Sequence, residues 1–317
     1  MLSLDIRQDN DTRGVWPFIS RGFYASAGFL VRTDIPSEEL FLPGQRLYLK
    51  RTTNLLAFLF SCYNRDYLCH TYDDRTMVIW GTFFAQVLGY FLGCVPYIVM
   101  DVLRLPFFER YKVQQNKYAD KKSSLHATFS VLLIFIAVVL PLIAIGEKVL
   151  RLCGMTRDGP LPSVSTIFIQ VVFFFFVEDY TNYWIHRWLH TPFWYKHVHS
   201  VHHEFTAPFS LAATYAHPIE IIALGIPTFL GPLLIGPHLL TLWIWMLARN
   251  YEAIDIHSGY ELPWNINNYL PFYAGTQHHD FHHYMHSGNF ASIFVWCDRL
   301  YGTDVQYETY RQKVESS

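Results

Sequence analysis

The stretch STIFIQVVFFFFVEDYTNYWIHRWLH, residues 165–190, joins a long apolar run to a pair of histidines. The apolar part, 165–186, is long enough to cross a bilayer, which takes about 20 residues of helix. His186 and His190 are four residues apart, so a helix places both imidazoles on the same face. The stretch therefore predicts a membrane helix that brings two candidate metal ligands to one membrane surface.

The composition of the whole chain is typical of a membrane protein. Of 317 residues, 51% are hydrophobic and only 16% are charged, which is too apolar for an ordinary soluble domain of this length. The net charge of −2 and the lack of a long run of one charge sign argue against a nucleic-acid partner. The five cysteines are scattered and form no CxxC pair, so we expect reduced, structural cysteines rather than disulfides or a thiolate zinc site.

Three apolar segments predict membrane crossings, at 78–103, 129–146 and 165–186. The stretch that follows the first of them, 104–122, is rich in Arg and Lys, and the positive-inside rule places such a loop in the cytosol. By parity the third crossing also ends in the cytosol, which places His186 there. No secretory signal is evident in the first 30 residues.

A fourth apolar region, 219–248, is too long for one helix and contains Pro227, Pro232 and Pro237. Proline interrupts helical hydrogen bonding, so we expect two half-length arms that start and end on one side of the membrane. The predicted fold is an all-α, integral membrane helical bundle with a cytosol-facing, histidine-rich di-metal site. Its predicted parts are an N-terminal region of unknown role (1–75), membrane helices with a basic cytosolic loop (76–164), a catalytic domain (165–305) and a tail (306–317).

The di-metal prediction comes from three histidine clusters with helical spacings: HRWLH, HSVHH and HHDFHH. Offsets of three and four residues place the imidazoles of each cluster on one helix face. Eight nitrogens exceed the four ligands of a structural zinc site and include no thiolate, so two five- or six-coordinate ions such as iron fit better. Each cluster alone could be a solvated or capping group, and only the combination predicts the metal centre. The eight predicted ligands are His186, His190, His199, His202, His203, His279, His282 and His283.

Two more histidines are candidates for the same centre. His257 follows an apolar segment that also carries Glu252 and Asp255, and charged groups at membrane depth usually mark function. His217 in YAHPIE is a further candidate, and a structural role is the alternative for both. The remaining histidines are assigned to the surface, to turns or to pockets: His70, His126, His197, His238, His278 and His286.

Polar side chains near the clusters are candidates to orient the ligands. On a helical wheel Asp179 lies within about 20° of His186 and His190, whereas Glu178 points about 80° or more away. Asp179 is therefore expected to hold a ligand imidazole in one tautomer through a hydrogen bond. The candidates for such supporting roles are Asp179, Asn182 and Asp280, and for the two aspartates a role at a helix end is the alternative. The side chains expected to line a substrate pocket, with plain packing as the alternative, are Phe205, Phe209, Tyr215, Trp264 and Phe272.

Longer motifs around the clusters resemble the fatty acid hydroxylase superfamily, and more narrowly the sterol 4α-methyl oxidases, also called methylsterol monooxygenases. The motifs are VEDYTNYWIHRWLH, YKHVHSVHHEFTAPFSLAATYAHPIE and HSGYELPWNINNYLPFYAGTQHHDFHH, so the resemblance extends well beyond the clusters. Within that group, EDYTNYW and LGIPTF are most similar to the plant-type enzymes that act on 4,4-dimethylsterols.

The resemblance implies a multi-pass enzyme of the endoplasmic reticulum membrane, in contact with membrane lipid, with two iron ions per chain and dioxygen as co-substrate. It would convert a C4 methyl group of a 4,4-dimethylsterol stepwise to the carboxylate, with electrons from NAD(P)H by way of cytochrome b5 and its reductase. A sterol C4-decarboxylase/dehydrogenase and a ketoreductase would be its partners. The three clusters would hold the irons, and His217 and His257 also match family positions.

The chain departs from the family pattern in three places. These are its first 75 residues, the segment YMHSGNF, which is shorter than in plant-type relatives, and His278, where an aromatic residue is expected. His278 is thus an alternative ligand beside His279. Two other functions remain open at this point: another lipid hydroxylase or sterol desaturase of the same superfamily, and a non-enzymatic membrane protein that binds zinc.

Overall fold

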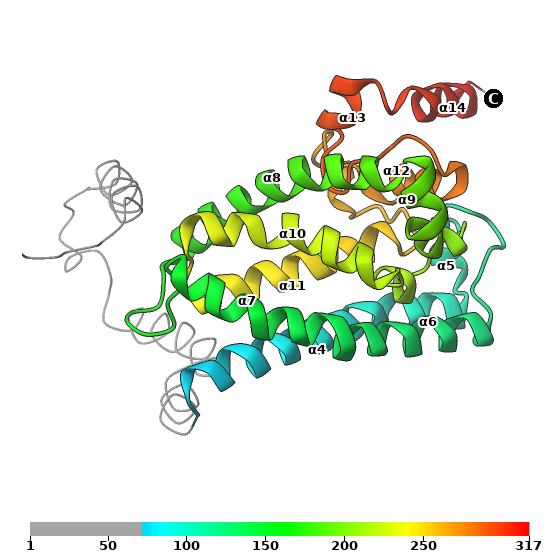
Figure 1. Cartoon of the computed structure of the whole chain (residues 1–317). Coiled ribbons are helices and arrows are strands. Elements are labelled where there is room, and N and C mark those ends of the chain that lie inside the picture. The colour runs from blue at the N-terminus through cyan, green and yellow to red at the C-terminus, as the bar shows by residue number, and fades with distance from the viewer. Residues whose placement is uncertain (1–71, 317) are drawn as a thin grey trace, which may run out of the picture. The chain divides into compact units, whose positions relative to one another are not determined.

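The computed structural model describes residues 72–316 and shows an all-helical bundle in that part of the chain (Figure 1). Of the predicted N-terminal region, 1–75, only residues 72–75 are among the described residues, and His70 lies outside them. The long elements are α4 (Asp74–Leu103), α6 (Lys121–Ile134), the π-helical η1 (Phe135–Val139), α7 (Leu140–Leu152), α8 (Val164–Leu189), α10 (Pro218–Ile235) and α11 (Leu239–Ile256).

Within residues 72–316, four helical stretches are long and apolar enough to cross a membrane: α4, the continuous α6–η1–α7, α8 and α10. The protein is therefore a multi-pass membrane protein, as the sequence predicts. Side-chain caps fix where three of these helices begin, because an oxygen of Asp73, Asp120 or Ser163 accepts a hydrogen bond from the backbone N–H three residues later.

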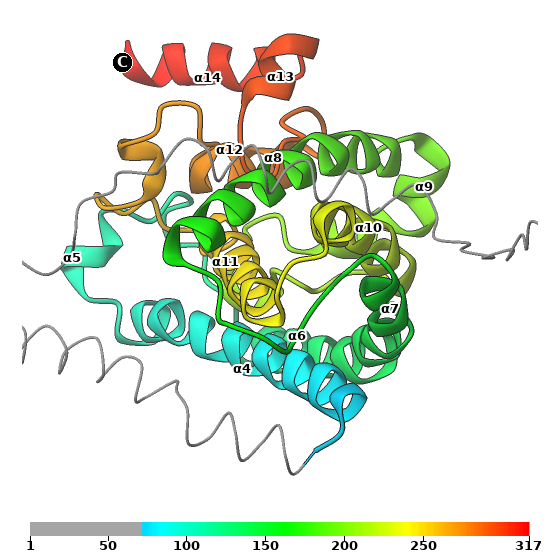
Figure 2. The same cartoon turned by 90° about the vertical axis from the view of Figure 1, so that its left-hand side faces the viewer.

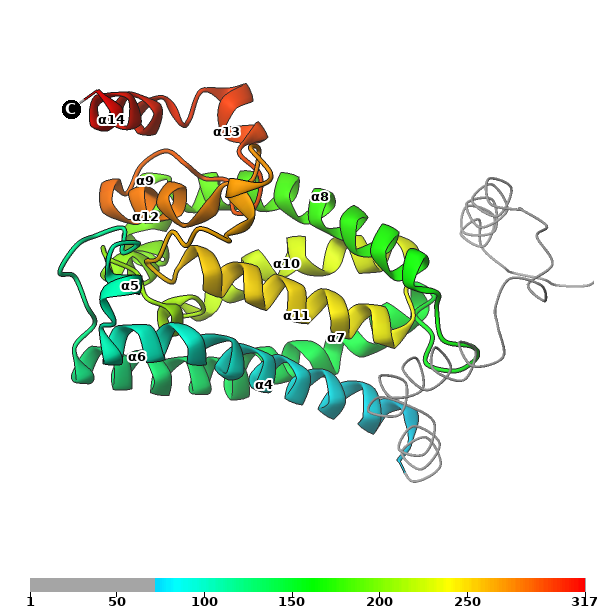
Figure 3. The same cartoon turned by 180° about the vertical axis from the view of Figure 1, so that it is seen from behind.

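The shorter elements gather mainly at one end of the bundle. Figures 1 and 3 show α5, α9 and α12 at the end where α4, α8 and α11 finish and where α6 and α10 begin. The sequence predicts this arrangement, in which every histidine cluster is delivered to the same end. The short elements are α5 (Pro106–Glu109), α9 (Pro192–His197), η2 (His199–Glu204), η3 (Ser210–Ala212), η4 (Ile266–Asn268), α12 (Gly275–Met285), α13 (Trp296–Tyr301) and α14 (Val305–Glu315).

Glycines on α4 let it pack closely on α11, which lies between α4 and α8 in the view along the bundle (Figure 2). A Cβ atom built on Gly81 would come within 2.6 Å of the Trp243 ring, and one on Gly89 within 2.3 Å of Leu247. Small residues at such crossings allow the backbones of membrane helices to approach. A larger side chain at either position would require the Trp243 or Leu247 side chain to move.

The hairpin of α10 and α11 differs from the prediction of two half-length arms. Helix α10 continues through Pro227 and Pro232 and ends only at Gly236, which adopts a left-handed φ of 57°. The carbonyl of Thr228, which Pro232 leaves without its helical N–H, instead accepts a hydrogen bond from Trp245 Nε1 at 2.9 Å. Both arms therefore have 18 residues, about 27 Å of helix each, and still start and end at the histidine end of the bundle.

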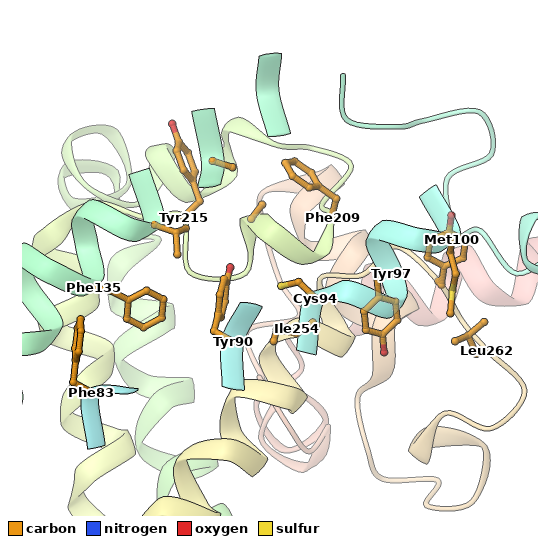
Figure 4. Close-up of a cluster of buried hydrophobic side chains, with 14 of the residues drawn as sticks. Phe83, Tyr90, Cys94, Tyr97, Met100, Phe135, Phe209, Tyr215, Ile254 and Leu262 are labelled. Carbon is orange, nitrogen blue, oxygen red and sulfur yellow. The ribbon is translucent and has the colours of Figure 1, made fainter. Parts of the chain in front are cut away.

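A buried apolar cluster holds the loop after the second histidine cluster against α4 (Figure 4). Tyr90 of α4 donates a hydrogen bond from its hydroxyl to the Leu211 carbonyl at 3.0 Å and accepts one from the Thr214 N–H. Phe135 of η1 packs against the Tyr90 ring. Cys94, which lies in the same cluster, is a buried free thiol.

Candidate metal centre

Nine buried or half-buried histidines form two groups at the histidine end of the bundle, and in each group one ligand nitrogen per residue lies within 4.8 Å of the others. The five-histidine group consists of His186, His190, His199, His203 and His282. The four-histidine group consists of His202, His257, His279 and His283. All eight residues of the three sequence clusters are thus brought together, and His257 joins them.

The local helix geometry divides the clusters between the two groups. The HSVHH cluster forms the 3₁₀-helix η2 rather than the predicted α-helix, and it sends His199 and His203 to one group and His202 to the other. Helix α12 is divided in the same way, with His282 in the five-histidine group and its neighbours in the four-histidine group. The two groups therefore share two structural elements, as expected for two metal ions side by side.

Hydrogen bonds to backbone carbonyls fix the tautomer of five of the nine ligand histidines. A carbonyl can only accept, so each Nδ1 that faces one carries the proton and leaves its Nε2 lone pair free. These Nδ1 bonds run from His186 to Phe290 O at 2.8 Å, from His202 to Tyr215 O at 3.0 Å, from His257 to Ala253 O at 2.7 Å, from His282 to Gly288 O at 2.6 Å and from His283 to Phe205 O at 3.2 Å.

The inward Nε2 atoms fit a pair of bound cations. His202 Nε2 and His257 Nε2 are 3.2 Å apart, and both carry lone pairs because their protons are on Nδ1, so the two atoms repel each other unless a cation lies beside them. Two nitrogens at right angles around one ion, each about 2.1 Å from it, would be separated by about 3 Å. The buried Nε2 atoms of His282 and His283 have no hydrogen-bond partner among the described residues. The donor set therefore suits two metal ions.

Burial keeps the ligands in the form that binds metal. Outside the membrane helices, desolvation holds the pKa of His202 below its ordinary 6.5 and the pKa values of His279 and His283 well below it. Neighbouring imidazoles lower the latter two further. These side chains are consequently neutral at physiological pH, with a lone pair available to a metal.

Glu220 is a functional residue that the sequence reasoning missed. Its carboxylate is almost fully buried at the start of α10 and lies 2.8 Å from His199 Nδ1. A carboxylate on the outer nitrogen of a ligand histidine orients the ring and makes the inner nitrogen a stronger ligand. In the sequence, Glu220 is the last residue of YAHPIE and stands at the start of an apolar segment. A carboxylate in such a position usually marks function, and this signal could have identified it.

The prediction that Asp179 orients a ligand does not match the contacts. Asp179 accepts hydrogen bonds from the backbone N–H groups of Ile293 and Phe294 and from Trp296 Nε1, so it ties α8 to the segment after α12. The helical wheel gives the correct face, but Asp179 is seven residues from His186, about 10 Å along the axis, which is too far for a hydrogen bond.

The other two supporting candidates also have partners other than histidine. Asp280 accepts a hydrogen bond from Gln114 Nε2 at 2.8 Å, and Asn182 donates one to Glu178 at 2.9 Å. Glu178, which the wheel turns away from the ligands, also accepts a bond from Arg249 Nε at 2.9 Å. These residues connect the elements around the metal centre. Within residues 72–316, their hydrogen bonds described here are not made to an imidazole.

Of the six described histidines outside both groups, three are close in sequence to the ligands or are candidate ligands by sequence. His217 caps the start of α10, because its Nδ1 accepts a hydrogen bond from the N–H of Ile219 at 3.2 Å. His278 is buried with its Nε2 3.5 Å from Asp298 and its ring against that of Tyr307. His286 ends α12 in a left-handed conformation. His217 and His278 are thus not placed as ligands here.

A cavity of about 210 Å³ begins at the metal centre and extends into the bundle. Five of the nine histidines border it, and its other walls come from α4, η1, α7, α8, α10 and α11. None of the five aromatic residues that the sequence suggests as pocket lining borders it: Phe205, Phe209 and Tyr215 pack in the apolar cluster of Figure 4, while Trp264 and Phe272 are 50% and 44% exposed.

Comparisons with known proteins agree with this site. The fatty acid hydroxylase family profile matches residues 171–303, which include all nine histidines. The chain is 41% identical over 245 residues to methylsterol monooxygenase 2-2 of Arabidopsis thaliana, with 76% of this chain and 91% of the relative covered. It is 40% identical over 245 residues to very-long-chain aldehyde decarbonylase GL1-8 of Oryza sativa subsp. indica, with 76% and 90% covered. No solved structure matches the chain.

The chain belongs to the fatty acid hydroxylase family, whose members include relatives named as methylsterol monooxygenases. Methylsterol monooxygenase 1-3 of Arabidopsis thaliana is 39% identical over 229 residues, with 71% of this chain and 79% of the relative covered. Identities to the sterol-named and aldehyde-named relatives are about equal, so the family is clear while identity alone does not separate these two activities.

Proposed function

We propose that the protein is a methylsterol monooxygenase that oxidises a C4 methyl group of a 4,4-dimethylsterol to the carboxylate. The observation that carries the proposal is the pair of histidine groups at the head of a mainly apolar cavity. Support comes from the relatives named as methylsterol monooxygenases, which share about two-fifths of the aligned residues with this chain.

Two iron ions held by the nine histidines would supply the activation of dioxygen that C–H oxidation requires. The chain itself holds the imidazoles neutral and in one tautomer, through burial and through the carbonyls that face Nδ1. The apolar walls of the cavity exclude water and hold a lipid with one carbon at the histidine end. Positioning and water exclusion are therefore the contributions of the protein.

An aldehyde decarbonylase is the second candidate, because a relative with that name is as similar as the sterol-named ones. Its substrate would be a single long alkyl chain rather than a fused ring system. The two activities differ in product, so one sterol and one aldehyde offered to the same purified protein separate them. A zinc-binding protein without enzymatic activity would convert neither substrate.

Location and partners are part of the proposal. The basic stretch 104–122 follows α4 at the histidine end, which supports a metal centre at the cytosolic face of the endoplasmic reticulum membrane. Electrons would come from NAD(P)H through cytochrome b5 and its reductase, and a sterol C4-decarboxylase/dehydrogenase and a ketoreductase would act on the product. A tag at the C-terminus should be accessible to antibody when only the plasma membrane is permeabilised; protection of the tag would contradict this orientation.

Complementation tests the proposed activity. A strain that lacks C4-methylsterol oxidation accumulates 4,4-dimethylsterols, and expression of this chain should restore sterols without C4 methyl groups. A matched strain should express His202→Ala, which removes a ligand of the four-histidine group and should not restore them. Unchanged accumulation of 4,4-dimethylsterols with the wild-type chain, expressed and loaded with iron, would contradict the proposal.

A further inference from the structure

One face of α10 lines the cavity from the metal centre inward. Ile221, Leu224 and Thr228 recur at intervals of three and four residues on that face and border the cavity. The row starts directly after Glu220, whose carboxylate contacts His199. A substrate held with one carbon at the histidines therefore lies along α10.

Gly225 belongs to the same cavity lining, and the packing of the bundle does not require a glycine there. At Gly231, also in α10, a Cβ atom would come within 2.7 Å of Phe174 on α8, so packing requires a glycine there. At Gly225 nothing lies within 4 Å of the added Cβ, and the backbone has no left-handed φ that would favour glycine. Glycine inside a helix is less stable than alanine, so neither packing nor backbone geometry accounts for it.

Gly225 lies at the depth in the cavity where a bound substrate would place the atoms next to its reacting carbon. Gly225 is five residues from Glu220, which corresponds to about 7.5 Å along the helix axis. In a sterol that reacts at C4, this depth is occupied by the fused rings, which are rigid and wider than an alkyl chain. In a long-chain aldehyde it is occupied by a single chain that can bend around an extra side chain.

We propose that Gly225 is a specificity-determining residue, which keeps the cavity wide enough beside the metal centre for a fused-ring lipid. The inference rests on the proposed sterol function and names the feature of the chain that would distinguish a sterol from a single alkyl chain. A side chain at position 225 would project into open space in the cavity lining and narrow it.

The test uses the series Gly225→Ala, Gly225→Val and Gly225→Leu in the full-length protein loaded with iron. Gly146→Leu is the matched control, because Gly146 lies in α7, also has nothing within 4 Å of an added Cβ, and does not border the cavity. Binding of a 4,4-dimethylsterol and of a long-chain aldehyde is measured at equilibrium, together with iron content and sterol turnover.

The sterol Kd should rise with each added carbon and reach at least tenfold in Gly225→Leu, while iron content and aldehyde binding stay within twofold of the wild type. Gly146→Leu should leave the sterol Kd unchanged. A sterol Kd within twofold of wild type across the iron-loaded Gly225 series would overturn the inference. If the leucine variant fails to fold, the alanine and valine variants decide, because their smaller side chains fit the open space.

The outcomes also separate the two proposals. If the wild-type protein oxidises 4,4-dimethylsterols and the Gly225 variants bind the sterol with the same Kd, the proposed function stands and the proposed role of Gly225 is wrong. A wild-type protein that oxidises no sterol under conditions where it converts an aldehyde overturns the proposed function itself, whatever the variants do.

Discussion

Replacing Glu220 should weaken iron binding through His199 without removing any ligand. The Glu220 carboxylate lies 2.8 Å from His199 Nδ1, and both side chains are fully or almost fully buried. Glu220→Ala leaves that nitrogen without its partner, so the ring loses its fixed orientation and its inner nitrogen becomes a weaker ligand. Loss of such a supporting contact typically lowers metal affinity by about 10- to 100-fold, which corresponds to about 1.4–2.7 kcal/mol of binding free energy.

The assay is competition for iron between the detergent-solubilised protein and a chelator of known affinity. Glu220→Gln keeps an oxygen that can accept from His199 but has no charge, so its iron affinity should fall between those of wild type and Glu220→Ala. Glu147→Gln is the matched control, because Glu147 is also a buried carboxylate but lies in α7, where it pairs with Arg151. An iron affinity of Glu220→Ala equal to that of wild type would refute the reasoning.

Three other predictions follow from the same structure. His257→Ala should lower the iron content towards one ion per chain, whereas His217→Ala, which removes only a helix cap, should retain two. Iron is measured by elemental analysis, and equal iron in both variants would contradict the assignment of His257, and not His217, to the metal centre. Trp245→Phe leaves the Thr228 carbonyl without a donor and should lower the free energy of unfolding by about 1–3 kcal/mol, and by less in a Pro232→Ala background, which restores the helical N–H. Burial lowers the pKa of His202 in the folded, metal-free protein, so below pH 6.5 the unfolded chain binds more protons than the folded one. The free energy of unfolding should therefore fall as pH decreases, by up to about 1.4 kcal/mol per pH unit for this residue. An unfolding midpoint that is constant from pH 7.5 to 5.5 would contradict this.

The sequence predicts the membrane helices and the gathering of the histidines because both depend on local patterns. An apolar run of helical length is expected to cross the bilayer, and the number of such runs along the chain brings all three clusters to one end. Spacings of three and four residues place His186 and His190 together on α8 in any helical fold.

The remaining features depend on contacts between distant segments, which local patterns do not encode. The path of α10 through Pro232 depends on Trp245, which belongs to the next helix. The contact of Glu220 with His199 and the hydrogen bonds of Asp179 to the segment after α12 are likewise tertiary contacts. The spacing alone suggests an α-helix for HSVHH, whereas η2 is a 3₁₀-helix, and the assignment of its histidines to the two groups depends on the segments that face it.

The most direct test of the proposed activity is oxidation of a 4,4-dimethylsterol by the purified, iron-loaded protein under isotopically labelled dioxygen, with reductant and electron carriers supplied. Mass spectrometry should find the label in a C4 hydroxymethyl or carboxyl group of the product. Recovery of unmodified sterol, from a preparation that holds two iron ions per chain and converts a long-chain aldehyde, would contradict the account.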